Sequence, residues 1–159
     1  MKKLMVVLGG GGHTEQMLRV VDQLGESFNY VYLITEDDKV SEHKIKITGK
    51  IYRVKKAVRP YSYFFDKLYT LPANFFQSLY VYLKERPNAI VSAGPGTAIL
   101  ISFIGKLFGS KIIFIESWSR VRSFSSSGRI IYKFADLFFV QWEDMKELYP
   151  KAVYAGRLA

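Results

Sequence analysis

The chain has 159 residues, 49% of them hydrophobic, which is enough for one domain with a sizeable core over residues 1–159. It contains no cysteine, which excludes disulfides, thiolate zinc sites and thiol nucleophiles. The formal net charge of +9 favours an anionic partner: a nucleic acid, an anionic membrane surface or a phosphorylated substrate. No run of about 20 uncharged apolar residues is present, so we expect no conventional transmembrane helix and a cytoplasmic protein.

Short apolar runs alternate with stretches of helical spacing along the whole chain. Residues 4–8 are apolar and precede four glycines, which is typical of a strand buried on both faces. The patterns predict, in order, a strand at 4–8, a helix at 13–24, strands at 30–34 and 50–54, a helical segment at 61–86, a strand at 89–92, a helix at 97–108, a strand at 111–115, a helix from Ser125 or Ser126 to about 134, a strand at 137–140, a short helix at 144–148 and a strand at 152–154. Pro72 interrupts the segment 61–86, so a kink or two helices are expected there. The alternation predicts an α/β fold with a doubly wound, mostly parallel, Rossmann-like sheet.

Three segments that follow predicted strands carry residues suited to ligand binding. They are Gly-Gly-Gly-Gly-His-Thr at 9–14, Ser-Ala-Gly-Pro-Gly-Thr at 92–97 and Glu-Ser-Trp-Ser-Arg at 116–120. Ligands of open α/β sheets bind at the carboxyl ends of the strands. Because parallel strands end on the same edge of a sheet, we expect these three segments to converge.

The glycine run is a candidate anion site. Glycines let the backbone approach a ligand closely, and the first amides of the next helix point at it, so Gly10, Gly11, Gly12 and Thr14 are candidate phosphate ligands. A P-loop is excluded because no Gly-Lys-Ser/Thr follows. A dinucleotide fingerprint remains an alternative: its first two glycines fit and an acid stands at 36 or 37, but its third glycine position is Thr14.

His13 and Glu116 are the candidate catalytic residues. A helix N-terminus favours neutral His13, as a general base for a sugar hydroxyl requires; the alternative is a structural histidine that caps the loop. Glu116 follows an apolar strand, which predicts an exposed carboxylate. It would orient His13, bind a sugar hydroxyl or pair with Arg120.

The remaining candidate ligand-binding residues lie in the other two segments. Gly94, Gly96 and Thr97 combine a tight turn with a helix start, so they are candidates to hold a diphosphate, although ordinary turn chemistry also explains them. Ser117 and Arg120 lie at the same predicted sheet edge. Arg120 suits a lipid diphosphate or an acidic partner, and a solvated surface explains it equally well.

Positive charge and aromatic residues are concentrated in residues 44–82. Eight Lys or Arg and one acid lie between Lys44 and Lys67, and nine aromatic residues lie between Tyr61 and Tyr82. Anionic lipids attract basic residues, and aromatic rings settle at headgroup depth. The segment therefore predicts contact with an anionic membrane surface through Lys55, Lys56, Arg59, Tyr61, Phe64, Phe65, Phe75 and Phe76. The alternative is that these aromatic residues form the core side of a helix.

Six motifs resemble the signatures of one known family. They are Gly-Gly-His-Thr-Glu-Gln-Met at 11–17, Ser-Ala-Gly-Pro-Gly-Thr at 92–97, Ile-Glu-Ser-Trp-Ser-Arg-Val at 115–121, Ser-Ser-Gly-Arg at 126–129, Val-Gln-Trp-Glu at 140–143 and Tyr-Pro-Lys-Ala-Val-Tyr at 149–154. The family contains the membrane-associated subunit of the bipartite UDP-N-acetylglucosamine transferase of the dolichol-linked oligosaccharide pathway. It also contains subunits of bacterial two-component glycosyltransferases that build capsular polysaccharide and exopolysaccharide on undecaprenyl diphosphate. The motifs follow the same order over essentially the whole chain.

The resemblance implies the amino-terminal half of a GT-B glycosyltransferase that supplies acceptor and membrane binding. A separate donor-binding subunit would bind most of the UDP-sugar. The pair would transfer a sugar, with inversion and without a metal or other cofactor, to a polyprenyl-diphosphate-linked acceptor. The chain would lie peripherally on the cytoplasmic face of the membrane, and its tail at 155–159 would dock on the partner.

Other functions predict different behaviour. A non-catalytic subunit would anchor and activate its partner, so changes at His13 and Glu116 would alter assembly or nothing. A nicotinamide-binding oxidoreductase would bind its cofactor without a partner. A nucleic-acid binder is disfavoured, because the aromatic residues cluster in an apolar segment instead of alternating with basic residues.

Overall fold

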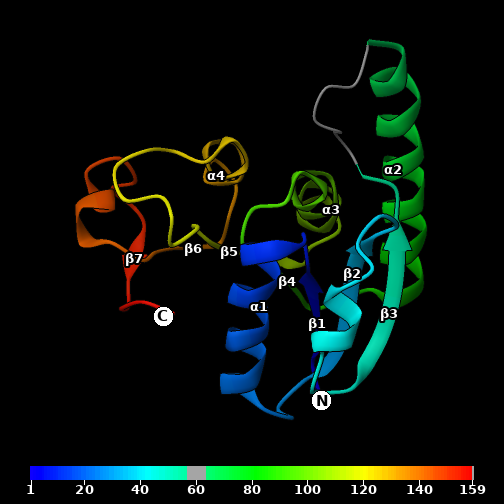
Figure 1. The fold of residues 1–159 in the computed structure, drawn as a ribbon, viewed down its shortest axis with the longest axis horizontal. Helices are drawn as coiled ribbons and strands as arrows, with labels where there is room; N and C mark the ends of the chain where they lie inside the picture. Colours follow the sequence, from blue (N-terminus) through cyan, green and yellow to red (C-terminus); the bar gives the residue numbers. More distant parts are fainter. Residues whose placement is uncertain (57–63, 159) are drawn as a thin grey trace.

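Strand β1 (Lys3–Val7) lies inside a seven-stranded parallel sheet with the order β3-β2-β1-β4-β5-β6-β7 (Figure 1). The computed structural model describes residues 1–56 and 64–158. The other strands are β2 (Asn29–Thr35), β3 (Gly49–Val54), β4 (Ala89–Ser92), β5 (Lys111–Ile115), β6 (Leu137–Val140) and β7 (Val153–Tyr154). The chain runs outward from β1 to β3 and then returns to place β4 on the other side of β1. Such a reversal leaves a crevice at the carboxyl ends of the two central strands.

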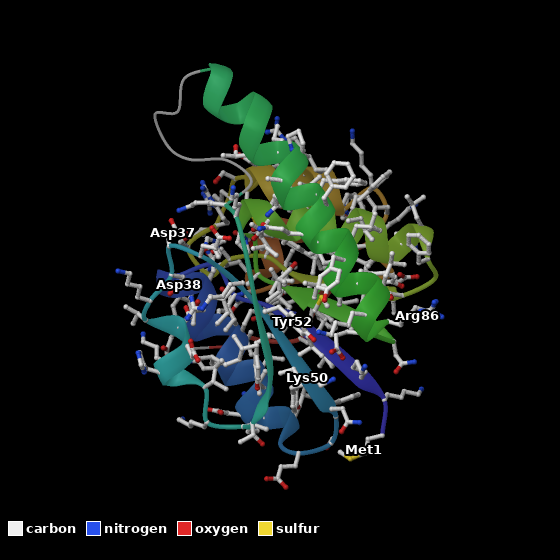
Figure 2. The ribbon with its side chains drawn as sticks, turned by 90° about the vertical axis from the view of Figure 1, so that its right-hand side faces the viewer. Met1, Asp37, Asp38, Lys50, Tyr52 and Arg86 are labelled. Atoms are coloured by element: carbon white, nitrogen blue, oxygen red, sulfur yellow. The ribbon has the colours of Figure 1, made fainter. Side chains whose placement is uncertain are left out.

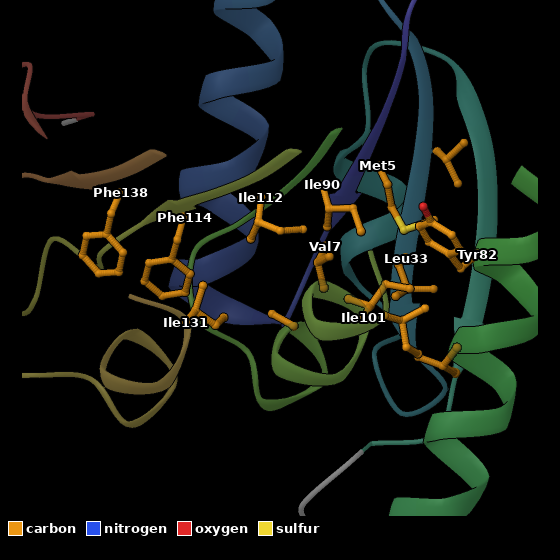
Figure 3. Packing of buried hydrophobic residues seen from close by; sticks show 14 of the residues in the cluster. Met5, Val7, Leu33, Tyr82, Ile90, Ile101, Ile112, Phe114, Ile131 and Phe138 are labelled. Carbon is orange, nitrogen blue, oxygen red and sulfur yellow. The ribbon is translucent and has the colours of Figure 1, made fainter. Parts of the chain in front are cut away.

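Helices cover both faces of the sheet. They are α1 (Gly11–Leu24), η1 (Ser41–Lys44), α2 (Phe64–Glu85), α3 (Gly96–Leu107), α4 (Ser126–Ile131) and η2 (Glu143–Lys146). Helix α1 packs on one face through Met17, Leu18 and Val21. Helices α2, α3 and α4 cover the other face, where Ile101 of α3 lies against buried side chains of the sheet (Figure 3). The predicted doubly wound α/β fold is therefore confirmed.

Helix α2 differs from the prediction. It continues through Pro72 from Phe64 to Glu85, so of the two expected alternatives, a kink or two helices, two helices are wrong. Beyond the proline, Ser78 and Tyr82 are buried, and the Asn74 side-chain amide donates to the Lys55 carbonyl. These contacts after Pro72 hold the second part of the helix in place despite the hydrogen bond that a proline removes. No helix in residues 1–56 and 64–158 is long and apolar enough to cross a bilayer.

Helix α2 ends at Glu85, a buried carboxylate tied to two strands. Lys3 of β1 and Lys50 of β3 pair with its oxygens at 2.7 and 2.9 Å, and the Tyr52 hydroxyl donates to it at 2.6 Å. Figure 2 shows Lys50 and Tyr52 on β3 beside this end of α2. Burial alone would raise the pKa of Glu85, but the hydrogen bonds from Lys3, Tyr52 and Lys50 lower it to about 2.

We expect the substitution Glu85→Gln to lower the free energy of unfolding by about 2–3 kcal/mol at pH 7, because the lysines lose a buried ionised partner. The folded-state pKa lies below the ordinary value of 4.5, so this stabilisation is complete above about pH 5 and decreases as the pH falls toward 2. Urea unfolding of both proteins across this pH range measures the difference. Glu147→Gln, at an exposed position, is the control; equal effects of the two substitutions would contradict the assignment.

Candidate functional site

The predicted loops converge on a cavity of about 510 Å³ at the carboxyl edge of the sheet. It lies beyond β1, β4 and β5, at the reversal of strand order. Its lining residues are Gly12, His13, Gly94, Gly96, Ile99, Ser117, Trp118, Ser119, Arg120, Ser125, Ser126 and Ser127. Six of the sequence-based candidates therefore share one cavity: Gly12, His13, Gly94, Gly96, Ser117 and Arg120.

His13 stands in the first turn of α1 and lines the cavity. Burial lowers the pKa of its imidazole; the negative charge of Glu116 opposes this shift, and the positive charge of Arg120 adds to it. The ring makes no hydrogen bond to the part of the chain that the structure describes. A neutral imidazole at the wall of a cavity is able to accept a proton from a bound hydroxyl.

The Gly94 turn fits tightly against His13. Gly94 has a φ of 116°, which side chains rarely adopt, and a Cβ added there would lie 3.2 Å from Nε2 of His13. The Ser127 hydroxyl donates to the Gly94 carbonyl at 2.7 Å, which joins the turn to α4. The position of the imidazole is thus fixed by the β4–α3 turn as well as by its own helix.

Two helix N-termini meet at the cavity. Helices α1 and α3 begin at Gly11 and Gly96, and neither has an acidic residue in its first turn. Their first amide groups have no partner within the helix, so this edge of the cavity favours an anion. Gly12 and Gly96 are exposed to it, whereas Gly10 is half-buried at the N-cap of α1.

The two threonine candidates do not line the cavity. Thr14 is buried; its Oγ1 accepts a hydrogen bond from the Gly10 amide at 3.0 Å and hydrogen-bonds with Ser41 at 2.6 Å. Thr97 is buried in the first turn of α3. Thr14 therefore holds the glycine loop through its hydrogen bond with the Gly10 amide and does not face the cavity.

Glu116 is buried, so the expectation of an exposed carboxylate is wrong. The carboxylate accepts hydrogen bonds from the Ser117 amide at 2.9 Å, the Ser125 hydroxyl at 3.0 Å and the Tyr149 hydroxyl at 3.0 Å. These donors occupy the carboxylate in place of Arg120, which was one of the three alternatives for Glu116. A Cβ added to Gly128 would lie 2.3 Å from Oε2 of Glu116, so α4 approaches the carboxylate closely. Burial and the charge of Glu116 raise the pKa of Tyr149, which keeps this phenol a donor.

Residues that the sequence analysis did not select hold this edge together. The side-chain amides of Gln16 and Gln141 both donate to the Glu116 carbonyl, at 3.1 and 2.9 Å. Oε1 of Gln141 accepts from the Leu158 amide, and the Leu158 carbonyl accepts from Arg19. The signal for Gln141 was its position directly after a predicted strand.

Two tryptophans connect the cavity to the tail. The Trp142 indole donates to the Trp118 carbonyl at 2.7 Å, and the Arg157 guanidinium lies 3.7 Å from the centre of the Trp142 ring. Arg19 lies over Trp118, which lines the cavity. Residues 155–158 are thus anchored on the domain beside the cavity wall.

The residues predicted to contact a membrane lie apart from the cavity. Lys56 pairs with Asp37 at 3.2 Å, Lys55 is half-buried, and Phe76 is exposed on α2. Phe75 is partly buried against the hydrophobic core between α2 and the sheet, which fits the alternative that the aromatic residues form the core side of a helix. Arg59 and Tyr61 lie outside the described residues, as do the side chains of Phe64 and Phe65 at the start of α2. Within residues 1–56 and 64–158, no group of three His, Asp or Glu side chains is placed to hold a metal ion.

The sequence matches the model of the family described as "Oligosaccharide biosynthesis protein Alg14 like" over residues 4–158. The chain belongs to this family. It is 32% identical to the UDP-N-acetylglucosamine transferase subunit alg14 of Schizosaccharomyces pombe, with 99% of this chain and 84% of the relative aligned. It is 30% identical to the corresponding subunit of Mus musculus, with 98% and 82% aligned. The resemblance noted from the motifs is therefore confirmed.

The fold agrees with that of a solved structure. MurG of Acinetobacter baumannii superposes with a TM-score of 0.72 at 17% identity, over 99% of this chain and 44% of MurG. The chain thus spans less than half the length of that protein. The predicted Rossmann-like fold is therefore confirmed.

We expect Tyr149→Phe to lower the free energy of unfolding by about 1–3 kcal/mol, because the buried Glu116 carboxylate loses a donor. Chemical denaturation at neutral pH measures the effect. Tyr154→Phe is the matched control, since Tyr154 is exposed on β7. If both substitutions changed stability equally, the Tyr149 hydroxyl would not be supporting Glu116.

Proposed function

We propose that this chain is the acceptor-binding subunit of a two-component glycosyltransferase that transfers a sugar from a UDP-sugar to a polyprenyl-diphosphate-linked acceptor. The observation that carries the proposal is His13, with a lowered pKa, at the wall of a cavity where two helix N-termini meet. Membership of a family of oligosaccharide biosynthesis proteins supports the same reaction class.

In this proposal His13 is the general base. Its neutral imidazole takes the proton from an acceptor hydroxyl while that oxygen forms a bond to the anomeric carbon of the donor sugar. The bond from the anomeric carbon to the UDP oxygen breaks, UDP leaves with the electron pair, and the configuration inverts. Glu116 is buried behind the loop, so it serves as a positioning residue.

The acceptor diphosphate is assigned to the amides at the starts of α1 and α3, with Arg120 as a cationic side chain. Gly12 and Gly96 are exposed and line the cavity, which allows a phosphate oxygen to approach their backbone closely. Arg120 is exposed at the same cavity and has no ion-pair partner in the described part of the chain. These groups suit two negative charges held near His13.

The donor half is assigned to a partner subunit. The relatives are named as transferase subunits, which supports a division of the enzyme between two proteins. On the α1 face of the sheet, an apolar groove of about 530 Å³ runs between α1 and the tail. Val20, Phe28 and Phe139 line it together with residues 155–158. Such a groove suits an apolar segment of a partner protein, with the anchored tail as one of its walls.

The membrane role is assigned to the basic and aromatic segment within residues 44–82. Lys55 and Lys56 lie just after β3, and Phe76 is exposed on α2. Basic side chains and an exposed aromatic ring in one segment suit a peripheral position on an anionic leaflet.

A reconstitution assay tests the two-component proposal. The purified chain, with or without its co-expressed donor-binding subunit, receives membranes that contain lipid-linked acceptor and radiolabelled UDP-sugars. We expect label in the lipid fraction only when both proteins are present. Transfer by this chain alone would contradict the division between two subunits, and failure of the complete pair with every donor would contradict the glycosyltransferase assignment.

We expect His13→Ala to lower kcat of the assembled pair by about 10²–10⁴-fold. Because the pKa of His13 lies below its ordinary value of 6.5 and the neutral form is active, kcat should rise with pH through that lower pKa and be constant above about pH 7. His43→Ala, at an exposed position on η1, is the control and should leave kcat unchanged. Normal turnover by the His13 variant would favour a non-catalytic anchoring subunit.

A further inference from the structure

Helix α3 is apolar on all sides although one side is exposed. Its sequence, Gly-Thr-Ala-Ile-Leu-Ile-Ser-Phe-Ile-Gly-Lys-Leu, contains one charged residue, Lys106. Such a helix is normally buried all round. Its inner side packs on the sheet through Ala98 and Ile101, but Phe103 and Leu107 are exposed, Leu107 to 69%.

Helix α2 extends this apolar surface. Phe76, Tyr80 and Leu83 are spaced as i, i+4 and i+7 and are all exposed, Phe76 to 66%. Phe108, just after α3, is exposed, and its ring centre lies 5.4 Å from that of Tyr82 on α2. We call the side chains of Phe76, Tyr80, Leu83, Phe103, Leu107 and Phe108 the helix-layer face. Large exposed apolar patches mark interaction surfaces.

The charges around this face suit anionic lipid. Lys84 is exposed between the rings of Tyr52 and Tyr80, and Arg86 is exposed at the end of α2. Lys106 pairs with Asp136, which also pairs with Lys111. Between Thr70 and the end of α2, the single acidic residue is Glu85, which is buried and paired with Lys3 and Lys50. Exposed cations next to aromatic and aliphatic side chains are typical of membrane-surface helices.

The helix-layer face also leads to the cavity. Ile99 lines the cavity, and Phe103 and Leu107 follow it at i+4 and i+8 on the same side of α3. The apolar groove assigned to the partner lies on the opposite face of the sheet. Lipid on the helix-layer face would therefore leave that groove free.

We propose that the helix-layer face inserts into an anionic lipid leaflet, with Phe103, Leu107 and Phe108 of the α3 region reaching the acyl chains. The proposal rests on the proposed function, and it extends the membrane contact beyond residues 44–82. A lipid-linked acceptor would reach His13 from the leaflet along the Ile99–Phe103 side of α3.

The absence of cysteine allows single labels to test this. Leu107→Cys and Phe103→Cys carry an environment-sensitive fluorophore, and Val40→Cys, exposed to 61% near η1, is the matched control. Vesicles of phosphatidylcholine with phosphatidylglycerol should shift the emission of both α3 labels to the blue, and brominated acyl chains should quench them. The label at 40 should show neither effect, and vesicles of phosphatidylcholine alone should give weaker shifts.

A second variant removes the apolar side chains. Leu107→Ser with Phe108→Ser should bind the anionic vesicles about tenfold more weakly, because exposed side chains no longer transfer from water to lipid. Both positions are exposed, so thermal unfolding should change only by the contact of Phe108 with Tyr82, and transfer to a short-chain, water-soluble acceptor by the assembled pair should persist.

The outcomes separate this inference from the function it rests on. If the chain floats with vesicles while the α3 labels behave like the label at 40, the helix-layer face is not the inserted surface, and the membrane role of 44–82 stands. If the α3 labels shift without lipid as protein concentration rises, the face binds a second copy and the proposal is overturned. If the chain does not bind anionic vesicles at all, the peripheral membrane role itself fails.

Discussion

The carboxylate and the carbonyl of Glu116 are surrounded by donors from separate parts of the chain, and the shape of the cavity depends on them. Ser125 and Tyr149 bind the carboxylate, while Gln16 and Gln141 bind the carbonyl. A buried carboxylate is costly unless its oxygens are satisfied, so the elements that supply the donors are held in one arrangement. The loop after β5 is fixed in this way between α1, α4 and the end of β6. Serines of that loop line the cavity together with His13.

The architecture separates three surfaces of different chemistry. The polar cavity lies at the carboxyl edge of the sheet, the apolar groove lies on the α1 face, and the helix-layer face lies on the outer side of α2 and α3. In the proposed function the cavity takes the reacting groups and the groove takes the partner subunit, and in the further inference the helix-layer face takes the lipid. Because the cavity borders α3 through Ile99 and the tail through Trp118 and Trp142, it has a direct contact path to each of the other two surfaces.

Local sequence patterns predicted the strands and the residues that follow them, because these depend on the hydrophobicity of short segments. Strands β1, β4 and β5 are short apolar runs, and parallel strands end on one edge of the sheet. The meeting of His13, Gly94 and Ser117 therefore followed from their positions after these strands. The sequence did not reveal burial that depends on distant partners. Glu116 looked exposed because its donors Ser125 and Tyr149 are remote in sequence, and Glu85 carried no signal because Lys3 and Lys50 reach it only in the folded sheet.

The order of the strands has a consequence for the synthesis of the chain. Strand β1 pairs with β2, which follows soon after it, but its other edge pairs with β4, where Leu4 lies opposite Ala89. When chains fold during translation, the amino-terminal half is available first. One edge of β1 therefore stays unpaired until α2 has been made and β4 has emerged, and an open apolar strand edge invites aggregation. A chaperone would be most useful to this protein after the amino-terminal half has been made and before β4 has emerged.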